Sequence, residues 1–338
     1  MLLSELTTLR VGGPCADVVV ADSEAALIEA VGDADAARVP VLLLGGGSNL
    51  LISDVGFEGR VVLVRSEGWE TAGDLVTVAA GESWSGFVTS MVSESRAGVE
   101  ALSGIPGAVG ATPFQNVGAY GAEVADTIRT VRAFDRRLGT EVRLTADQCG
   151  FGYRSSIFKS DPQRYLILEV TFELPRRESS APVRYSELAR TIGVDVGAVA
   201  AIEEVAGAVL SLRRAKGMVL DDADHDTWSA GSFFTNPVMS AAAAADILPV
   251  EAPRYPAPLG AVKTSAAWLI EHAGFSKGYR VRPGAPASLS GKHTLALTNR
   301  GGANALDMLE LARAVRDGVV AQFQIDLLPE PILVGCSL

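Results

Sequence analysis

The chain has 338 residues, a formal net charge of −11 at pH 7, and apolar residues at 48% of its positions. This length exceeds one compact core, so we expect a globular protein of two or three subdomains with enough apolar side chains to bury. The negative charge and the lack of a dense run of lysine and arginine argue against a nucleic-acid partner or an anionic membrane surface.

Cysteine usage and the chain ends indicate the cellular setting. Cys15, Cys149 and Cys336 are widely separated and include no Cys-x-x-Cys pair, which favours reduced thiols over disulfides or a zinc site. The N-terminus lacks the basic and apolar stretches of a secretory signal. No apolar run approaches the roughly 20 residues that span a bilayer. We expect a cytoplasmic protein.

The first third of the chain alternates strand and helix patterns. The expected strands lie at 18–21, 41–44 and 50–52, with a further pair at 60–65 and 75–80. Helices are expected over 23–31, opened by an Asp–Ser pair of the capping type, and over 84–94. This alternation gives the beginning of the chain an α/β character.

The remainder mixes a glycine-rich stretch with strands and helices. Residues 98–121 contain almost no charge, so this stretch is no solvent linker, and its backbone must approach something closely. Later strands are expected at 130–134, 141–144 and 165–172, followed by a final strand over 325–330 and 332–334 that Pro329 and Pro331 interrupt. Helical spacing covers 195–216, 241–245, 264–273 and 303–320.

Two glycine-rich segments point to a cofactor. The turn Gly45-Gly46-Gly47-Ser48-Asn49 follows a buried strand, and its N–H groups can curl into an anion-binding nest. It matches neither a Gly-x-Gly-x-x-Gly nor a Walker sequence, so a purely structural turn is the alternative. Residues 105–121 suit either an extended, partly aromatic ligand or a packed crossover loop. Together the two glycine-rich segments suit a dinucleotide cofactor, and a flavin dinucleotide more than a nicotinamide dinucleotide.

Two charged residues have sequence neighbours that suit a ligand-binding or catalytic residue. Arg154 lies between Tyr153 and two serines in a segment apolar enough to be half buried. A buried guanidinium needs an anion, either a ligand or one of the chain's carboxylates. Glu330 lies between Pro329 and Pro331, which suits a catalytic carboxylate as well as an ordinary chain end.

Two other positions each have a functional and a structural interpretation. Lys216 ends a predicted helix and either neutralises a phosphate or forms a solvated helix terminus. His225 lies among Asp222, Asp224 and Asp226, a spacing that resembles a metal cluster. No second histidine lies nearby to complete such a site, so this stretch is expected to be an exposed acidic loop.

Ser232 stands between a glycine and the pair Phe233 and Phe234. A hydroxyl flanked by flexible backbone and an apolar wall suits proton transfer in a partly dry cavity. No Gly-x-Ser-x-Gly elbow occurs in the chain, so a role as acyl-transfer nucleophile has no support. We therefore interpret Ser232 as a proton donor.

Seven blocks occur in order along the chain. They are Thr7-Thr8-Leu9-Arg10-Val11-Gly12-Gly13, Leu44-Gly45-Gly46-Gly47-Ser48-Asn49, Gly104-Ile105-Pro106-Gly107, Gln115-Asn116-Val117-Gly118-Ala119-Tyr120-Gly121, Tyr153-Arg154-Ser155-Ser156-Ile157-Phe158, Ala230-Gly231-Ser232-Phe233-Phe234 with Asn236-Pro237, and Pro329-Glu330. With these blocks nearly the whole chain resembles the UDP-N-acetylenolpyruvoylglucosamine reductase (MurB) family. Tyr185 and residues 153–159 resemble its longer-loop branch.

The resemblance implies an α+β fold. It consists of a FAD-binding domain of the vanillyl-alcohol-oxidase or PCMH type, built from two subdomains, and a C-terminal α+β substrate-binding domain. The implied boundaries are 1–64 for the first subdomain, joined by the C-terminal strand 325–338, then 65–200 for the second, and 201–324 for the substrate domain.

The resemblance also implies roles for single residues. The matching catalytic positions are Arg154, Ser232 and Glu330. The matching cofactor positions are Leu44, Gly45, Gly46, Gly47, Ser48, Asn49, Gly107, Gly110, Thr112, Gly118 and Arg154. The matching substrate positions are Tyr120, Tyr153, Tyr185, Lys216, Asn236 and His293, and no metal is implied.

The implied reaction reduces UDP-N-acetylglucosamine enolpyruvate to UDP-N-acetylmuramate in peptidoglycan precursor synthesis. NADPH is the reductant, non-covalently bound FAD passes hydride from N5 to C3, and Ser232 protonates C2. One alternative is an FAD-dependent carbohydrate or alcohol oxidase that shares only the flavin domain. Such oxidases often tether flavin through histidine, and no histidine precedes His225. Another alternative is a non-catalytic binding protein. A monomer is expected.

Overall fold

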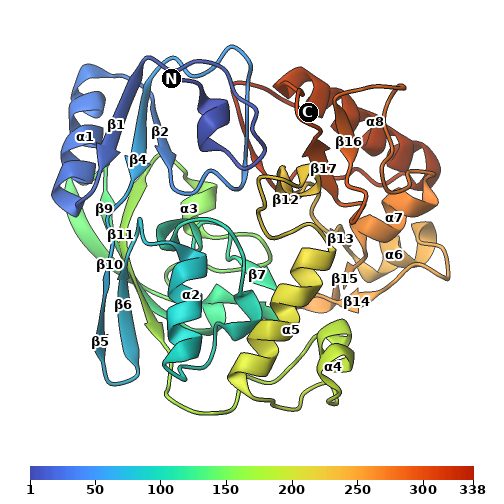
Figure 1. The fold of residues 1–338 in the computed structure, drawn as a ribbon, viewed down its shortest axis with the longest axis horizontal. Coiled ribbons are helices and arrows are strands. Elements are labelled where there is room, and N and C mark those ends of the chain that lie inside the picture. The colour runs from blue at the N-terminus through green and yellow to red at the C-terminus, as the bar shows by residue number, and fades with distance from the viewer. The chain divides into compact units, whose positions relative to one another are not determined.

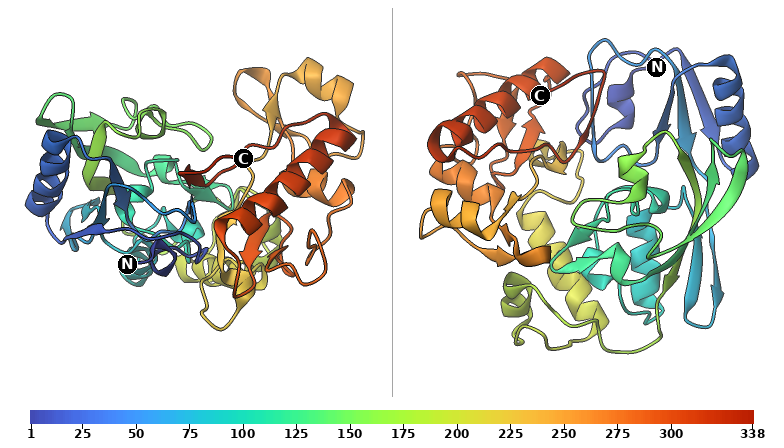
Figure 2. Two further views of the ribbon diagram at one scale, coloured as in Figure 1. Left: turned by 90° about the horizontal axis from the view of Figure 1, so that it is seen from above. Right: turned by 180° about the vertical axis from the view of Figure 1, so that it is seen from behind.

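The structure, a computed structural model, describes residues 1–338. The chain folds into two compact units. The terminal unit comprises residues 1–15, 47–57 and 220–338, and the central unit comprises 16–46 and 58–219. Figures 1 and 2 show their elements, with both chain ends in the terminal unit. The division of the chain into three subdomains stays a prediction.

A parallel three-stranded sheet begins the central unit, with strand order β1-β4-β2. Its elements are β1 (Asp17–Ala21), α1 (Glu24–Ala37), β2 (Val41–Leu44) and β4 (Arg60–Val64). The Ser23 hydroxyl caps α1 by accepting the N–H of Ala26. The predicted helix at 23–31 is confirmed but continues to Ala37, where Arg38 in a left-handed conformation ends it.

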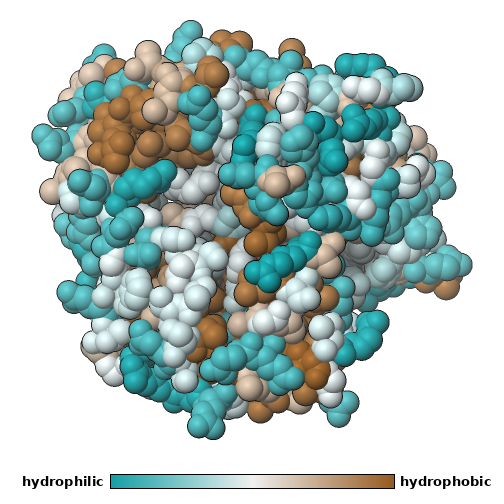
Figure 3. All heavy atoms as spheres, in the orientation of Figure 1, coloured by the Kyte–Doolittle hydropathy of each residue, from teal (hydrophilic) through white to brown (hydrophobic).

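Helix α1 packs against one face of the parallel sheet. Val19 and Val62 point to the face that packs against Leu27 of α1. On the opposite face Val20 is 59% exposed and Leu42 is half-buried. Figure 3 shows apolar side chains gathered over the part of the molecule that contains α1 and β1.

The second sheet of the central unit has five antiparallel strands in the order β10-β9-β11-β6-β5. They are β5 (Trp69–Ala72), β6 (Leu75–Ala79), β9 (Ile128–Asp135), β10 (Thr140–Thr145) and β11 (Tyr165–Glu173). The expected pairing of the strands at 60–65 and 75–80 is wrong, because β6 pairs with β5 and β11 instead of β4. β5 is exposed throughout, so it lacks the apolar pattern that predicts a strand.

Helices and short strands complete the central unit. They are α2 (Trp84–Ser93), β7 (Gly118–Ala119), β8 (Ala122–Glu123), α3 (Ile157–Ser160), α4 (Ser186–Ile192) and α5 (Ile202–Ala215). The rings of Trp84, Phe87 and Phe172 form the centre of its core. The helix predicted over 195–216 starts only at Ile202, because Gly197 has a φ of +96° and bonds to Val183.

The terminal unit contains three small sheets. Its strands are β3 (Leu50–Ile52), β12 (Ser229–Ser232), β13 (Val238–Met239), β14 (Tyr255–Pro256), β15 (Val262–Lys263), β16 (Ala287–Leu289), β17 (Ala296–Asn299) and β18 (Ile332–Val334). Its helices are α6 (Ala241–Ile247), α7 (Ala266–His272) and α8 (Ala305–Phe323). None of the helices has the length and apolar composition that crossing a bilayer requires.

The C-terminal segment joins two parts of the terminal unit. β18 pairs in parallel with β3, from Ile332 opposite Leu50 to Val334 opposite Ile52. The predicted final strand is confirmed over 332–334 as β18, but its first part at 325–330 is wrong, because only an isolated bridge between Phe234 and Pro329 forms there. Proline has no N–H to donate to a ladder, so Pro329 and Pro331 prevent regular pairing.

Candidate active site

Ser232 is the last residue of β12 in the terminal unit. β12 pairs with β17, and a bulge between Ser229 and Ser232 contains Gly231 at a φ of +74°. Bulges of this kind redirect side chains beside functional sites. Phe233 and Phe234 are each 1% exposed, with ring centroids 5.1 Å apart. The half-buried Ser232 therefore lies at the edge of an apolar wall.

Glu330 lies on the segment that runs antiparallel to residues 233–235. Its N–H donates to the Phe233 carbonyl at 2.8 Å. The Asn49 side-chain amide donates to the Glu330 carbonyl at 3.4 Å, and the Ile332 N–H donates to the Asn49 carbonyl at 3.0 Å. The terminal unit therefore brings the backbones of Glu330 and Asn49 next to the residue that follows Ser232.

The block at 7–13 supports β12. The Thr8 hydroxyl donates to the Ser229 carbonyl at 2.7 Å. The side-chain amide of Asn299 donates to the carbonyls of Leu9 and Arg10 at 3.3 and 3.1 Å. These bonds tie the start of the chain to both β12 and β17, which fixes the strand that carries Ser232.

Asn236 and His293 lie elsewhere in the terminal unit. The Asn236 side-chain oxygen accepts the N–H of Ala266 at 2.9 Å, at the start of α7. His293 lies in the turn between β16 and β17, where its carbonyl accepts the N–H of Ala296 at 3.1 Å. Both predicted substrate residues are thus placed by backbone contacts of this unit.

The acidic segment around His225 is held by cations of the terminal unit. Asp224 pairs with Lys292, which holds the pKa of that carboxyl below its usual range. Asp226 accepts from Arg300 at 2.7 Å, and its side chain is 14% exposed. The expectation of an exposed acidic loop is therefore wrong for these two residues. No group of three or more His, Cys, Asp and Glu side chains is placed to bind a metal.

Arg154 lies against the second glycine-rich segment, in the central unit. Its Nη2 donates to the Gly118 carbonyl at 2.6 Å, and the Lys159 ammonium donates to the Arg154 carbonyl at 3.0 Å. Arg154, Tyr120 and Asn116 have left-handed φ values of 52°, 50° and 47°. Each such residue stores strain of roughly 1–3 kcal/mol, and such residues cluster at functional sites.

Three predicted substrate residues converge in the central unit. The rings of Tyr120 and Tyr185 are perpendicular, with centroids 5.5 Å apart. The Lys216 ammonium lies 5.6 Å from the Tyr120 ring and pairs with Glu187. Burial raises the pKa of Tyr120 to about 12, so its phenol stays a hydrogen-bond donor at neutral pH. The fourth, Tyr153, packs its ring 5.4 Å from the Arg154 guanidinium.

Arg213 belongs to the same surroundings but was not singled out from the sequence. It is 9% exposed, its Nη2 donates to the Met218 carbonyl at 2.7 Å, and its buried Nε has no partner. Burial lowers the pKa of Arg213 to about 10. The sequence does contain a signal, because Arg213 follows the buried Val209 by four residues, on the same face of α5.

The first glycine turn closes tightly on the loop at 104–112. In the central unit a Cβ on Gly46 would lie 2.6 Å from the Gly107 Cα, and a Cβ on Gly110 would lie 2.6 Å from the Ala80 Cβ. The N–H groups of Gly46 and Gly107 meet no acceptor of the chain. Close backbone approach with N–H donors that meet no acceptor of the chain fits the pyrophosphate of a dinucleotide.

Other predicted cofactor positions have structural contacts. Leu44 is fully buried at the end of β2. The Thr112 hydroxyl donates to the Val109 carbonyl at 2.8 Å. In the terminal unit the Gly47 carbonyl accepts the N–H of Thr8 at 3.1 Å, and Ser48 precedes Asn49 there. These residues shape the backbone on either side of the turn.

Two family matches define the class of this protein. Residues 15–145 match the FAD binding domain, and residues 222–334 match the C-terminal domain of UDP-N-acetylenolpyruvoylglucosamine reductase. The chain is an FAD-dependent oxidoreductase with an α+β fold, and the predicted PCMH-type flavin domain with a C-terminal domain is confirmed. The oxidase alternative, which shares only the flavin domain, is wrong because the match continues through residue 334.

Full-length relatives identify the family. The chain is 53% identical to UDP-N-acetylenolpyruvoylglucosamine reductase of Nocardia farcinica over 99% of its length and 89% of the relative. It is 52% identical to that of Cutibacterium acnes, covering 99% and 90%. The crystal structure of the Thermus caldophilus reductase (MurB) matches with a TM-score of 0.69 at 26% identity, covering 99% of this chain and 97% of that one. The chain belongs to the UDP-N-acetylenolpyruvoylglucosamine reductase family.

Proposed function

We propose that the chain reduces UDP-N-acetylglucosamine enolpyruvate to UDP-N-acetylmuramate with NADPH and FAD, a step of peptidoglycan precursor synthesis. Similarity to reductases of this name over 99% of the chain supports the proposal. We place the enzyme in the cytoplasm, where its nucleotide substrates occur, and expect a monomer.

The position of Glu330 gives the proposal its main structural support. Glu330 bonds through its backbone to Phe233, the residue after Ser232. This backbone bond brings Glu330 next to the residue that follows Ser232, although the two are distant in the sequence. Such a pair suits a reaction that adds a proton to carbon while negative charge develops on a neighbouring carboxylate.

When bound, FAD would supply the hydride, derived from NADPH, that adds to C3 of the enolpyruvyl ether. The Ser232 hydroxyl then gives its proton to C2. Arg154 stabilises the charge that develops on the substrate carboxylate, and a well-aimed donor contributes about 3 kcal/mol to such a step. Glu330 assists only in its protonated form, because a bare carboxylate repels the developing charge.

The remaining residues bind the sugar nucleotide in this proposal. Lys216 faces the ring of Tyr120 and pairs with Glu187 on the partly exposed side of α4. A diphosphate carries more charge than one carboxylate, so it competes with Glu187 for the Lys216 ammonium. Tyr120 and Tyr185 offer rings and hydroxyls, and Tyr153, Asn236 and His293 complete the proposed contacts.

Replacing Ser232 with alanine tests the proposed proton transfer. We expect S232A to be reduced by NADPH at the wild-type rate, because hydride transfer to flavin does not use this hydroxyl. Reoxidation by the enolpyruvyl sugar nucleotide should slow by about 100-fold or more, the usual contribution of a positioned acid. Stopped-flow absorbance of the flavin measures both half-reactions.

The matched control is Thr235→Ala, three residues further along the same segment. Its hydroxyl donates to the Leu328 carbonyl at 3.3 Å and has no proposed catalytic role. T235A should retain both half-reactions within about twofold. A wild-type rate of reoxidation in S232A would show that the proton comes from another group.

A further inference from the structure

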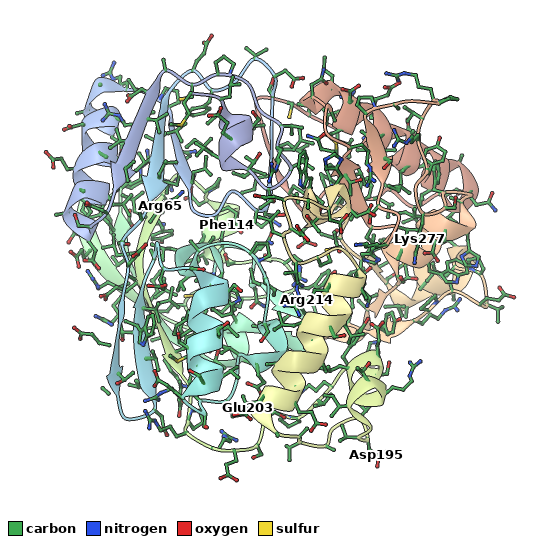
Figure 4. The ribbon with its side chains drawn as sticks, in the orientation of Figure 1. Arg65, Phe114, Asp195, Glu203, Arg214 and Lys277 are labelled. Carbon is green, nitrogen blue, oxygen red and sulfur yellow. The ribbon has the colours of Figure 1, made fainter.

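Arg65 follows β4 directly and is anchored to the end of β2. Its Nη1 donates to the carbonyls of Val64 at 2.8 Å, Gly45 at 3.0 Å and Leu44 at 3.5 Å. Figure 4 labels Arg65 beside the strands of the parallel sheet. One nitrogen of a half-buried guanidinium thus links the end of β4 to the last carbonyl of β2 and the first carbonyl of the glycine turn.

The rest of the Arg65 guanidinium has no partner in the chain. Nε and Nη2 form no hydrogen bond, and neither is among the buried unpartnered atoms, so both reach solvent. Arg65 also forms no ion pair, although the chain carries a net charge of −11. A guanidinium has five N–H donors in a planar fork that matches phosphate oxygens. Three of these donors remain available here.

Arg65 contacts Gly45 of the glycine seat, by which we mean Gly45, Gly46, Gly107 and Gly110. A Cβ on Gly45 would lie 3.0 Å from the Ala108 Cβ, and a Cβ on Gly46 would lie 2.6 Å from the Gly107 Cα. A carbonyl that points to Arg65 leaves the following N–H pointing away from it. The anchored carbonyl of Gly45 therefore orients the N–H of Gly46, which has no acceptor in the chain.

We propose that Arg65 is a binding and positioning residue for the FAD pyrophosphate. Through Nη1 it holds the end of β2 so that the N–H of Gly46 faces the phosphates, and its guanidinium supplies positive charge near them. This inference rests on the proposed location of the pyrophosphate at the glycine seat. A purely structural arginine would also hold the carbonyls, but it would not respond to the charge of a ligand.

Titration of the apoprotein with FAD, followed by flavin fluorescence, tests the role of Arg65. We expect Arg65→Met to weaken FAD binding by about 10- to 100-fold, the loss typical of charge-assisted hydrogen bonds. Arg65→Lys should lie between R65M and wild type, because it keeps the charge but loses the planar fork. The dependence of Kd on ionic strength should be shallower in R65M than in wild type and R65K.

Two further variants separate the possible failures. Arg60→Met removes an arginine from the other end of β4, where it bonds Asp17 and the Ala30 carbonyl, and should leave the Kd unchanged. Gly46→Ala obstructs the glycine seat itself and should weaken FAD binding. Circular dichroism of each apoprotein verifies folding, and R65K replaces R65M if the latter does not fold.

Each pattern of results leads to one conclusion. If G46A weakens FAD binding and R65M does not, the proposed role of Arg65 is overturned, whereas the proposed location of the pyrophosphate at the glycine seat is retained. If neither changes the Kd, the location of the pyrophosphate is wrong, and the proposed cofactor site fails with it. A weaker Kd in R65M with the wild-type salt dependence would overturn the charged contact.

Discussion

At the residue scale, the position of Arg154 depends on the neighbouring glycine Gly118. A Cβ on Gly118 would lie 2.8 Å from the Ala122 carbonyl oxygen and 3.1 Å from Arg154 Nη1. Arg154 Nη2 also donates to the Gly118 carbonyl. The contact between them therefore needs glycine, and the left-handed φ of Arg154 is maintained by these surroundings.

We expect Gly118→Ala to lower kcat by about 10- to 100-fold, because a displacement near 1 Å at a reacting group has effects of this size. Steady-state NADPH consumption with the enolpyruvyl sugar nucleotide measures the change. Gly207→Ala is the control, since a Cβ there meets no atom within 4 Å. An intact fold with wild-type kcat in G118A would contradict the proposed part of Arg154 in catalysis.

Sequence patterns predict the surroundings of some single residues and miss those of others. The apolar wall behind Ser232 was predictable, because two phenylalanines follow it directly in the chain. The partners of Asp224 and Asp226 were not predictable, because Lys292 and Arg300 are distant in sequence. Acidic composition alone predicts exposure, and only folding supplies the cations that allow partial burial.

At the element scale, three helix glycines differ in what surrounds them. Gly32 in α1 and Gly207 in α5 have no atom within 4 Å of a built Cβ. Gly318 in α8 faces Phe275, whose ring atoms would lie 2.4 and 2.5 Å from a Cβ. Glycine is therefore replaceable in α1 and α5, whereas in α8 it makes room for an aromatic ring.

Alanine at these positions should change stability in opposite directions. G32A and G207A should each raise the free energy of unfolding by about 0.5–1 kcal/mol, because alanine loses less backbone entropy in a helix. G318A should lower it by roughly 1–3 kcal/mol through overpacking against Phe275. Thermal unfolding followed by circular dichroism compares the three variants with wild type. A G318A variant as stable as wild type would show that Phe275 moves aside at no cost.

The sequence predicted helices and strands correctly where apolar residues recur with a clear helical or strand period. The strands at 41–44 and 50–52 are confirmed as β2 and β3, and the helix expected over 303–320 is confirmed as α8. β5 was missed because its four residues are exposed and its pairing comes from the turn at Gly73. Partners of strands were harder to predict, because pairing depends on the rest of the sheet.

At the scale of the whole molecule, acid stability depends on carboxylates held by cations. Asp135 is 1% exposed and bonds Arg164, which lowers its pKa. Lys292 likewise lowers the pKa of Asp224. A lowered pKa in the folded state contributes stability above the unfolded value of 3.8, and this is lost as the pH falls through the folded value.

The thermal midpoint should therefore fall as the pH drops below about 4. Asp135→Asn should be less stable than wild type at pH 7 and should lose less stability on acidification, because asparagine has no charge to neutralise. Calorimetry between about pH 3 and pH 7 measures both slopes. Equal slopes for D135N and wild type would assign the acid sensitivity to other carboxylates.

The sequence by itself determined the family, the flavin domain and most strands and helices, because these follow from ordered motifs and local apolar periods. Only the tertiary structure decided that Glu330 lies beside the residue after Ser232, that Arg213 is buried, and that Arg65 holds the glycine turn. These contacts join segments far apart in the chain. Their formation depends on which surfaces pack together, and no local pattern carries that information.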